Sequence, residues 1–535
     1  MMQPLLGVGS ALVIGLTVAG QIFALQCHQD AALGIPLIRV GWWAIYPPWG
    51  IVTWAWAWGA TTGITPWRFS LLGGGVAALF VLSQLARKPS RPSGQAHWAT
   101  KRELRHAECV GTPGSGVVLG KRGRTMLRYH GEGHCFFIGR TGGGKTATLI
   151  STLLESPAAL VAYDPTDSVF PHTAGYRATL GPVLRFAPFD AHTDCHNPLS
   201  LIRLGTDDEF ADAELVAQYH IEPESSHASD ATSKHFQDLA MMVTTGTMLY
   251  GLHSGLATTG AALNDLVTRT TWPDLVTVLQ HDPHPAVQQA GDLASRPGKD
   301  ELGSLQTTLA RAFRLYMDPR IAHVTSHSSY PLTTLREADA PASIYVTVPF
   351  AHLRRLRPLL RLFFCQVIEQ MTAHVDGWKH PLLFAIDEVT SLDRLDILSE
   401  ALDFVRKYQI RLLVCTPSME RLIAKYGQHH NWLEGSYIQL VLGLNDERVA
   451  ERFSKRVGTH KVTQRRVTRQ AGGQQSTTEE VRNEPLLSPT GLVQLPQDSV
   501  LVLAGKHSLV ASQTRFFDHE PWRTRSQLPL PGRTP

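Results

Sequence analysis

The stretch at residues 134–150, HCFFIGRTGGGKTATLI, limits more than any other what this chain can fold into. A short apolar run at 135–138 leads into a glycine-rich turn, and from Thr146 the chain can continue as a helix. The turn fits the pattern G-x-x-x-x-G-K-[ST] at every fixed position. A glycine-rich connection in an ordinary globular domain is the alternative, but the flanking strand and helix favour a phosphate-binding P-loop.

Each residue type in this turn has a specific expected role. Glycines with positive φ bring backbone N–H groups against phosphate oxygens, at a helix N-terminus that favours negative charge. Lys145 is expected to reach the β and γ phosphates, and the Thr146 hydroxyl to ligate Mg²⁺. The expected phosphate-binding residues are Gly139, Arg140, Thr141, Gly142, Gly143, Gly144, Lys145 and Thr146.

A second motif, PLLFAIDEV at residues 381–389, complements the P-loop. A continuous apolar run is typical of a central parallel strand buried on both faces, whose carboxyl end opens onto a ligand crevice. Asp387 is then placed to hold the Mg²⁺ shell, and Glu388 to act as the base that orients an attacking water. The alternative is an ordinary strand that ends in a solvated acidic pair.

Length and composition set broad limits. A chain of 535 residues has room for two or three domains. The net charge of +4 gives no global basic field for nucleic acid, so any DNA contact has to come from local patches or from a pore built by several subunits. The six cysteines show neither metal spacing nor a disulfide framework, which indicates a reducing compartment.

The first 86 residues are predicted to be a transmembrane anchor. Residues 5–25 carry no charge and are long enough to cross a bilayer, and a second span is expected at 67–86. The tryptophan-rich segment between them is expected to be an extracytoplasmic loop. A third span at the uncharged residues 41–63 is the alternative, although Pro47 and Pro48 interrupt it. A cleaved signal peptide is less consistent with residues 5–25, since no Lys or Arg precedes them. The basic residues Arg87, Lys88 and Arg91 place the remainder in the cytoplasm.

The rest of the chain reads as alternating strands and helices with one interruption. Residues 87–130 are expected to form a linker and two leading strands, at 117–119 and 125–129. A strand at 158–163 ends at Asp164, which either lies beside the phosphate crevice or caps the next turn. Residues 206–298 show helical spacing without strand alternation and are predicted to be a helical insertion. A strand at 342–348 precedes a helix whose arginines, Arg354, Arg355, Arg357 and Arg361, are expected on a solvated face, with a pore-facing or phosphate-binding role as the alternative.

Several of these segments together resemble one family. They are GQAHWATKRELRHA at 94–107, the P-loop, VAYDPTD at 161–167, FAPFDAHTDCHNPLSLI at 186–202, YVTVPFAHLRRLRPLLRLF at 345–363, the strand at 381–389, IRLLVCTPSMERLIAKYG at 410–427 and EPLLSPTGLVQLPQDSVLVLAG at 484–505. In this order they resemble the conjugal transfer TraG family, the membrane-bound coupling ATPases of type IV secretion. The resemblance covers nearly the whole chain.

The resemblance implies a fold and an assembly. The expected fold is a RecA-like α/β P-loop NTPase core with an inserted all-α domain, preceded by transmembrane helices. The nucleotide-binding domain is then residues 131–205 and 299–515, the inserted domain 206–298, and the tail 516–535. A homo-hexamer at the bacterial inner membrane is expected, multi-pass, with most of the chain in the cytoplasm.

The resemblance also implies a function. ATP and Mg²⁺ are the expected cofactors, and the expected partners are type IV secretion channel components, a relaxosome or an effector protein, and single-stranded DNA. The implied activity is ATP hydrolysis coupled to substrate delivery into the channel. A membrane-tethered receptor that binds nucleotide with little hydrolysis is the alternative. A chromosome-partitioning translocase and a soluble nucleotide kinase fit the other segments less well.

The sequence departs from the family pattern at two places. The family's sensor glutamine falls on Pro417, and its Asp-Pro-Lys-Gly-Glu motif reads Asp-Pro-Thr-Asp-Ser at residues 164–168. These changes are compatible with nucleotide binding but put the hydrolysis rate in question. Arg406 is expected with Lys145 and Glu388 in catalysis, as an arginine finger toward a neighbouring subunit; a helix-end arginine is the alternative, and Arg411 is a weaker candidate.

Three other features are predicted to be structural. The 24 histidines show no set at ligand spacing, so core or surface roles are expected for them rather than metal binding. The basic segment at 455–469 is expected to be a solvated hairpin or loop rather than a DNA contact. The Pro- and Arg-rich tail after Trp522 is expected to be loose.

Overall fold

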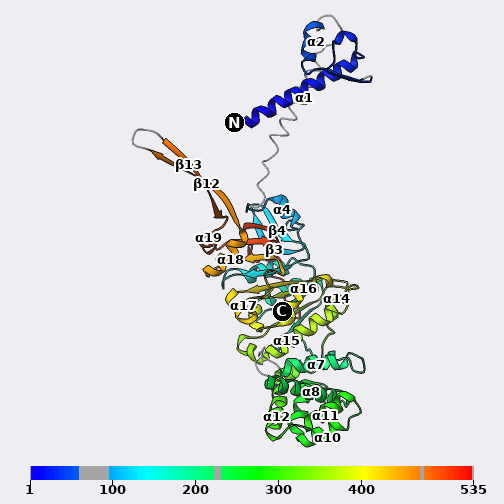
Figure 1. Ribbon diagram of the computed structural model, residues 1–535. Helices are drawn as coiled ribbons and strands as arrows, with labels where there is room; N and C mark the ends of the chain where they lie inside the picture. Colours follow the sequence, from blue (N-terminus) through cyan, green and yellow to red (C-terminus); the bar gives the residue numbers. More distant parts are fainter. Residues whose placement is uncertain (1, 42, 59–94, 222–230, 470–474, 533–535) are drawn as a thin grey trace. The chain divides into compact units, whose positions relative to one another are not determined.

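The computed structural model of the protein describes residues 2–41, 43–58, 95–221, 231–469 and 475–532 (Figure 1). The chain divides into two compact units, Met1–Gln95 and Ala96–Pro535, and each is described by itself. The span predicted at 67–86, and the linker as far as residue 94, lie outside the described residues.

The first unit is small and is built around one tryptophan. Its elements are α1 (Met2–Gln26), a 3-10 turn (Ala31–Leu33), β1 (Ile38–Val40), β2 (Trp43–Ile45) and α2 (Gly50–Trp58). The two strands pair antiparallel. Trp54 is buried against Phe23 with ring centroids 5.6 Å apart, and its indole N–H donates to the Leu33 carbonyl at 3.1 Å.

The described part of the first unit does not confirm the predicted membrane spans. Residues 5–25 lie within α1. In the ranges that the structure describes, no helix meets the combined length and hydropathy expected of a membrane-crossing segment. The tryptophan-rich segment forms the β1–β2 hairpin and the short helix α2, with Pro47 and Pro48 between them.

The second unit is organised on one mixed sheet of eleven strands, in the order β4-β3-β15-β14-β11-β5-β10-β9-β6-β8-β7. The seven strands from β11 to β7 are parallel, whereas β14, β15, β3 and β4 join antiparallel at one side. The strands are β3 (Val117–Arg122), β4 (Thr125–Tyr129), β5 (His134–Ile138), β6 (Ala159–Tyr163), β7 (Val183–Phe186), β8 (Ser343–Val346), β9 (Leu382–Ile386), β10 (Ile410–Thr416), β11 (Ser436–Val441), β14 (Ser499–Ala504) and β15 (His507–Ser512).

The parallel register brings the predicted site residues to one edge of this sheet. Phe136 of β5 pairs with Val414 of β10, which pairs in turn with Ile386 of β9. Ile386 also pairs with Tyr163 of β6. The loops that follow β5, β6, β9 and β10 therefore start side by side, as expected at the carboxyl edge of a parallel sheet.

Helices and one separate hairpin complete the second unit. The helices are α4 (Lys101–His106), α5 (Lys145–Leu153), α6 (Phe170–Leu180), α7 (Glu209–Ile221), α8 (Ala231–His253), α9 (Gly260–Arg269), α10 (Trp272–Gln280), α11 (Pro285–Ser295), α12 (Lys299–Phe313), α13 (Pro319–Val324), α14 (Thr334–Glu337), α15 (Phe350–Thr372), α16 (Asp396–Phe404), α17 (Met419–Tyr426), α18 (Glu447–Val457), α19 (Pro489–Val493) and α20 (Trp522–Arg525). The hairpin pairs β12 (Thr459–Arg469) with β13 (Gln475–Pro485) in a two-stranded sheet of its own.

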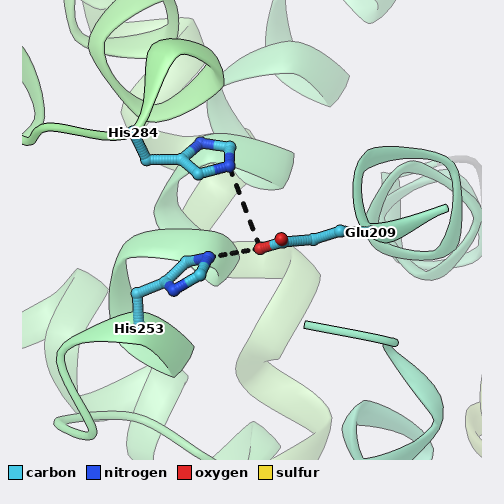
Figure 2. Close-up of side chains that lie close together, drawn as sticks. All are labelled: Glu209, His253 and His284. Carbon is cyan, nitrogen blue, oxygen red and sulfur yellow. Dashed lines mark hydrogen bonds and ion pairs between the residues drawn. The ribbon is translucent and has the colours of Figure 1, made fainter. Parts of the chain in front are cut away.

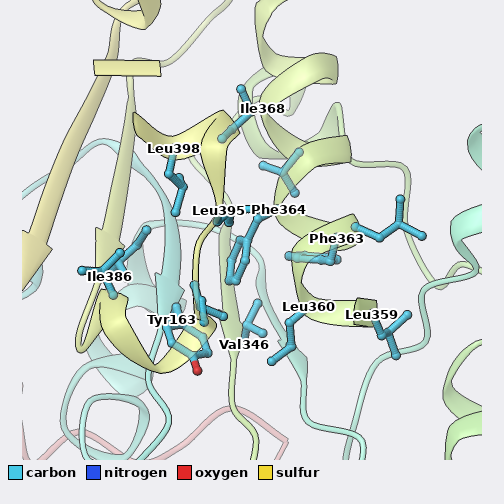
Figure 3. Close-up of a cluster of buried hydrophobic side chains, with 14 of the residues drawn as sticks. Tyr163, Val346, Leu359, Leu360, Phe363, Phe364, Ile368, Ile386, Leu395 and Leu398 are labelled. Carbon is cyan, nitrogen blue, oxygen red and sulfur yellow. The ribbon is translucent and has the colours of Figure 1, made fainter. Parts of the chain in front are cut away.

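Both faces of the parallel sheet are buried, which explains the continuous apolar runs in its strands. On one face the long helix α15 packs its Phe363 and Phe364 against side chains such as Tyr163 and Val346 (Figure 3). On the other face Phe137 lies in the cluster that includes Leu149, Ile150 and Leu153 of α5. Neighbouring residues of β5, Phe136 and Phe137, belong to opposite faces, so the strand fixes the position of the loop that follows it.

The described residues between β7 and β8 form α7 to α14 and short 3-10 turns, without a strand. Local signals explain several of these helices. Thr271 caps α10 by accepting a hydrogen bond from the Asp274 N–H, and Pro273 occupies the first turn. Figure 1 shows α8, α10, α11 and α12 gathered together, next to α7. Helices continue past residue 298, and the domain boundaries inferred from the sequence stay predictions.

Two local expectations are wrong. The tail after Trp522 is not loose: Trp522 is fully buried, and the Arg525 guanidinium donates to the Leu154 carbonyl at 2.6 Å. The arginines of α15 also do not share one solvated face. Arg361 is buried, and Arg357 donates to the Ser391 carbonyl at 3.1 Å.

Candidate nucleotide-binding site

Two different constraints explain the glycines in the loop between β5 and α5. Gly142 and Gly144 have φ of +76° and +94°, which glycine adopts without strain. Gly139 and Gly143 do not have positive φ, so that expectation is wrong for them. A Cβ at either position would lie 2.2 or 2.3 Å from the Leu442 carbonyl oxygen, so glycine is required there by close packing of the backbone.

Lys145 is held by the loop itself. Its buried ammonium donates to the carbonyl oxygens of Gly139 at 2.7 Å and of Arg140 at 3.2 Å. Helix α5 starts at Lys145 after Gly144, which has no side chain to cap the first-turn N–H groups. A helix N-terminus with free N–H groups and an adjacent ammonium is suited to bind phosphate.

Thr146 and Asp387 are brought into direct contact across the sheet edge. The Thr146 hydroxyl donates to Asp387 Oδ2 at 2.8 Å. Asp387 is buried, and burial raises its carboxyl pKa to about 6; the charges of Asp164 and Glu388 raise it too, while the Thr146 hydrogen bond and Lys145 lower it. A buried carboxylate next to a hydroxyl is an arrangement that binds a hard divalent cation.

Asp164 meets both expectations that the sequence left open. Its Oδ1 accepts the Thr166 N–H at 3.0 Å and its Oδ2 accepts the Val169 N–H at 2.5 Å, so it caps the turn after β6. It also lies close enough to Asp387 to raise the pKa of that carboxyl. In the same altered motif, Asp167 forms an ion pair with Arg185 at 2.9 Å.

Glu388 has a strained backbone at the end of β9, with φ of +74°. Its Oε1 accepts a hydrogen bond from the Thr390 hydroxyl at 3.0 Å and lies 3.9 Å from Nη1 of Arg421. Such left-handed positions in residues other than glycine concentrate at functional sites.

A cavity of about 330 Å³ lies next to the P-loop. Its lining includes Arg140 and Thr141 of the P-loop together with Pro417, Arg421 and Asp446. Pro417, where the resemblance predicts a sensor glutamine, therefore lines the same cavity as the P-loop residues Arg140 and Thr141.

The structure does not bring Arg406 together with the P-loop of its own chain. Arg406 is exposed, in a 3-10 turn (Val405–Tyr408) just before β10 begins, whereas the P-loop follows the carboxyl end of the parallel strand β5. It lines a separate cavity of about 600 Å³ with Arg411. Arg411 donates to the carbonyl oxygens of Gly131 and His130, as a structural residue does. The finger role of Arg406 concerns a second subunit and stays a prediction.

One contact at the site was missed from the sequence. Gln513 follows β15, and its side-chain N–H donates to the Gly143 carbonyl at 3.1 Å. Its Oε1 is buried and makes no hydrogen bond with the described residues. The short apolar run at 509–511 is a weak strand signal, and no local signal links it to a loop 370 residues away.

Residues 94–530 match the protein family described as "Type IV secretory system Conjugative DNA transfer". The chain belongs to this family. Among relatives of this type IV coupling protein is an Escherichia coli conjugal transfer protein TraG, 27% identical over 600 residues, covering 98% of this chain and 93% of the relative. VirD4 of Agrobacterium fabrum is 24% identical over 435 residues, covering 77% of this chain and 64% of VirD4.

Solved structures of a conjugative coupling protein share the fold. TrwBdeltaN70 in complex with sulphate has a TM-score of 0.61 at 18% identity, covering 79% of this chain and 94% of that one. TrwB in complex with the non-hydrolysable ATP analogue ADPNP has a TM-score of 0.61 at 16% identity, covering 80% and 96%. TrwB in complex with ADP and Mg²⁺ has a TM-score of 0.60 at 19% identity, covering 78% and 94%. TrwB and this chain therefore share an α/β fold with a mixed sheet.

Proposed function

We propose that this protein is the ATPase of a type IV secretion or conjugation system that recruits substrates and delivers them to the channel. The observation that carries the proposal is the 2.8 Å hydrogen bond between Thr146 and Asp387, which places P-loop and acidic pair at one sheet edge in a member of the conjugative DNA transfer family. The proposed substrates are a DNA–relaxase complex, an effector protein or both.

The P-loop residues have separate proposed roles. The backbone of residues 139–144, including Arg140 and Thr141, holds the phosphates, and Lys145 turns from the carbonyls of the loop toward them. Thr146 and Asp387 hold Mg²⁺, which neutralises phosphate charge when bound. The buried Asp387 carboxyl with its raised pKa fits this role, because a cation next to it stabilises the charged form.

Glu388 is the proposed general base. Its carboxylate accepts a proton from the attacking water once it exchanges the Thr390 hydroxyl for that water. Arg406 of one subunit is proposed to reach the nucleotide of the next, which requires the homo-hexamer that the family resemblance implies. An arginine finger raises phosphoryl-transfer rates by roughly 10³ to 10⁵.

Related proteins support the proposed cofactors and the proposed role in conjugation. TrwB is named in complex with an ATP analogue and with ADP and Mg²⁺, and the relatives include conjugal transfer proteins. We therefore propose ATP and Mg²⁺ as the cofactors of this chain. We propose type IV channel components and single-stranded DNA as its partners. Attachment to the bacterial inner membrane is proposed from the uncharged residues 5–25 and the basic residues that follow residue 86.

A receptor with little hydrolysis is the second candidate. The observation that favours it is Pro417, which lines the cavity at the P-loop and has no side-chain amide to contact a γ phosphate. In this case ATP binding alone switches substrate recruitment, and Glu388 stays bonded to Thr390.

Delivery in living cells tests the proposal. Donor cells carry Lys145→Ala or Glu388→Gln in place of the wild type, at equal protein level in the membrane fraction. Plasmid transfer and secretion of effector proteins are both counted. Loss of delivery in both variants supports the ATPase. Loss only in Lys145→Ala supports the receptor, and undiminished delivery in both variants contradicts the two proposals together.

A further inference from the structure

A glutamate and two histidines converge among the helices between β7 and β8, far from the nucleotide site in the sequence. Glu209 is the first residue of α7, His253 the last residue of α8, and His284 the residue before α11. One ligand atom from each lies within 4.8 Å of the others (Figure 2). Sequence spacing did not reveal this set, because Glu209 and His253 are 44 residues apart.

Both imidazole rings direct Nε2 at the same carboxylate oxygen (Figure 2). His253 Nε2 makes a short hydrogen bond with Glu209 Oε1, whereas His284 Nε2 lies 3.9 Å from that oxygen, too far for a hydrogen bond. The rings are stacked with centroids 5.1 Å apart. A hydrogen-bonded pair explains His253 but not the orientation of His284.

Hydrogen bonds from neighbouring groups hold the Glu209 carboxylate and the His284 backbone in place. Glu209 is buried, and its other oxygen, Oε2, accepts the Gly205 N–H at 2.7 Å, which fixes the carboxylate plane. The backbone N–H of His284 donates to Asp282 Oδ1 at 2.8 Å, so the turn before α11 is fixed too. The His284 Nδ1 is buried without a hydrogen-bond partner among the described residues, so His284 lacks the outer-shell hydrogen bond that the Glu209 carboxylate has.

We propose that Glu209, His253 and His284 bind one transition-metal ion, Zn²⁺ or a similar divalent cation. Two imidazole nitrogens and one carboxylate oxygen suit zinc, whereas Mg²⁺ and Ca²⁺ prefer oxygen ligands. Three protein ligands leave one position for water, and the His253 and His284 side chains are 34% and 28% exposed, which gives solvent a path.

The distances require only small side-chain rotations. Ligand atoms about 2.0–2.1 Å from a tetrahedral zinc ion lie about 3.3 Å from one another. The Glu209 to His253 contact must open and the 3.9 Å Glu209 to His284 contact must close. The metal takes the place of the hydrogen bond between Glu209 and His253, and it links residues at the ends of three helices.

Metal content and thermal stability test the site. Full-length protein without a histidine tag is stripped with chelator and exchanged into micromolar ZnCl₂ without nucleotide or Mg²⁺. We expect one zinc per chain in the wild type and a higher Tm with zinc. His284→Gln is expected to weaken zinc binding by more than the roughly 10- to 100-fold that loss of an outer-shell partner causes. Its Tm without zinc is expected to change little, because His284 contacts the cluster by ring stacking and a 3.9 Å approach to Glu209, without a hydrogen bond.

Matched variants separate this site from others. His281→Gln changes a nearby exposed histidine bonded to the Thr277 carbonyl and is expected to keep the zinc. Asp387→Asn disables the proposed Mg²⁺ site and is also expected to keep it. Glu209→Gln is expected to lose it. Wild-type protein without zinc, which would make the cluster a proton-bonded pair only, overturns the proposal, as does full zinc retention in His284→Gln. Neither result bears on ATP binding.

Discussion

Thr146 and Asp387 are 241 residues apart in the sequence, yet the Thr146 hydroxyl donates a 2.8 Å hydrogen bond to the Asp387 carboxylate. The contact exists because β5 and β9 are both neighbours of β10 in one parallel register. It joins the two halves of the proposed cation site.

Asp387→Asn is expected to stabilise the cation-free protein and to abolish the Mg²⁺ dependence of ATP binding. The folded-state pKa of Asp387 is raised to about 6 from an ordinary value of 3.8, so the folded protein holds this proton more tightly than the unfolded chain. Its contribution to stability is therefore present below pH 4 and is lost as the pH rises to 6. Above pH 6 the variant is expected to gain up to about 3 kcal/mol in unfolding free energy.

Urea unfolding at pH 4.5 and pH 8 without divalent ions measures this gain. The difference between variant and wild type should grow with pH. A variant that is less stable than the wild type at pH 8 contradicts the account, since it would mean that the Asp387 charge is already compensated in the cation-free protein.

Gln513→Ala is expected to weaken ATP binding without unfolding the protein. The Gln513 side chain holds the Gly143 carbonyl at 3.1 Å, and its loss frees the loop that has to present N–H groups to phosphate. Unfolding free energy should fall by no more than about 1.5 kcal/mol, the value of one hydrogen bond. Calorimetric titration with ATP gives the Kd. Gln527→Ala, at an exposed residue, serves as the control, and equal Kd values in both variants would count against the positioning role.

Pro417→Gln is expected to raise ATP turnover. The residue lines the cavity beside Arg140 and Thr141, where an amide can contact a γ phosphate and a proline side chain cannot. The gain should appear in kcat, with little change in ATP affinity. Steady-state turnover with Pro485→Gln as control checks it. An unchanged kcat in a folded variant would show that Pro417 does not limit hydrolysis.

Arg177→Ala is expected to be strongly destabilising. Arg177 is 1% exposed and donates to the Ser156 carbonyl, the Ala158 carbonyl and the Ser343 hydroxyl at 2.6, 2.5 and 2.8 Å. Truncation removes three hydrogen bonds of a buried guanidinium and leaves a cavity, a loss of roughly 3–5 kcal/mol. Thermal unfolding measures the loss against Arg269→Ala, an arginine 79% exposed, expected within about 0.5 kcal/mol of the wild type. A loss below 1 kcal/mol in Arg177→Ala would contradict this reading.

Local sequence patterns predicted several strands of the parallel part of the sheet. The apolar runs at 158–163, 342–348 and 381–389 are strands β6, β8 and β9, since strands buried on both faces contain few polar residues. The loops with chemistry follow directly from this, because they begin where such runs end. Helical spacing likewise indicated the region after residue 206.

Contacts between distant segments could not be predicted from the sequence. Strands β11, β14 and β15 are positioned by pairing with their neighbours in the sheet. Gln513 reaches the P-loop because it follows β15. The tail reads as loose from its Pro and Arg content, yet Trp522 is buried in the same apolar cluster as side chains of α5 and α6. The Glu209 cluster depends on three helix ends that no spacing rule connects.

Steady-state ATP turnover by the full-length protein with Mg²⁺, with and without single-stranded DNA, beside Glu388→Gln and Lys145→Ala, separates an ATPase from a receptor. We expect turnover in the wild type that rises with DNA and is lost in both variants, with ATP still bound by Glu388→Gln. Wild-type protein that binds ATP but does not turn it over in its assembled form, or turnover that survives in Glu388→Gln, would contradict the ATPase proposal.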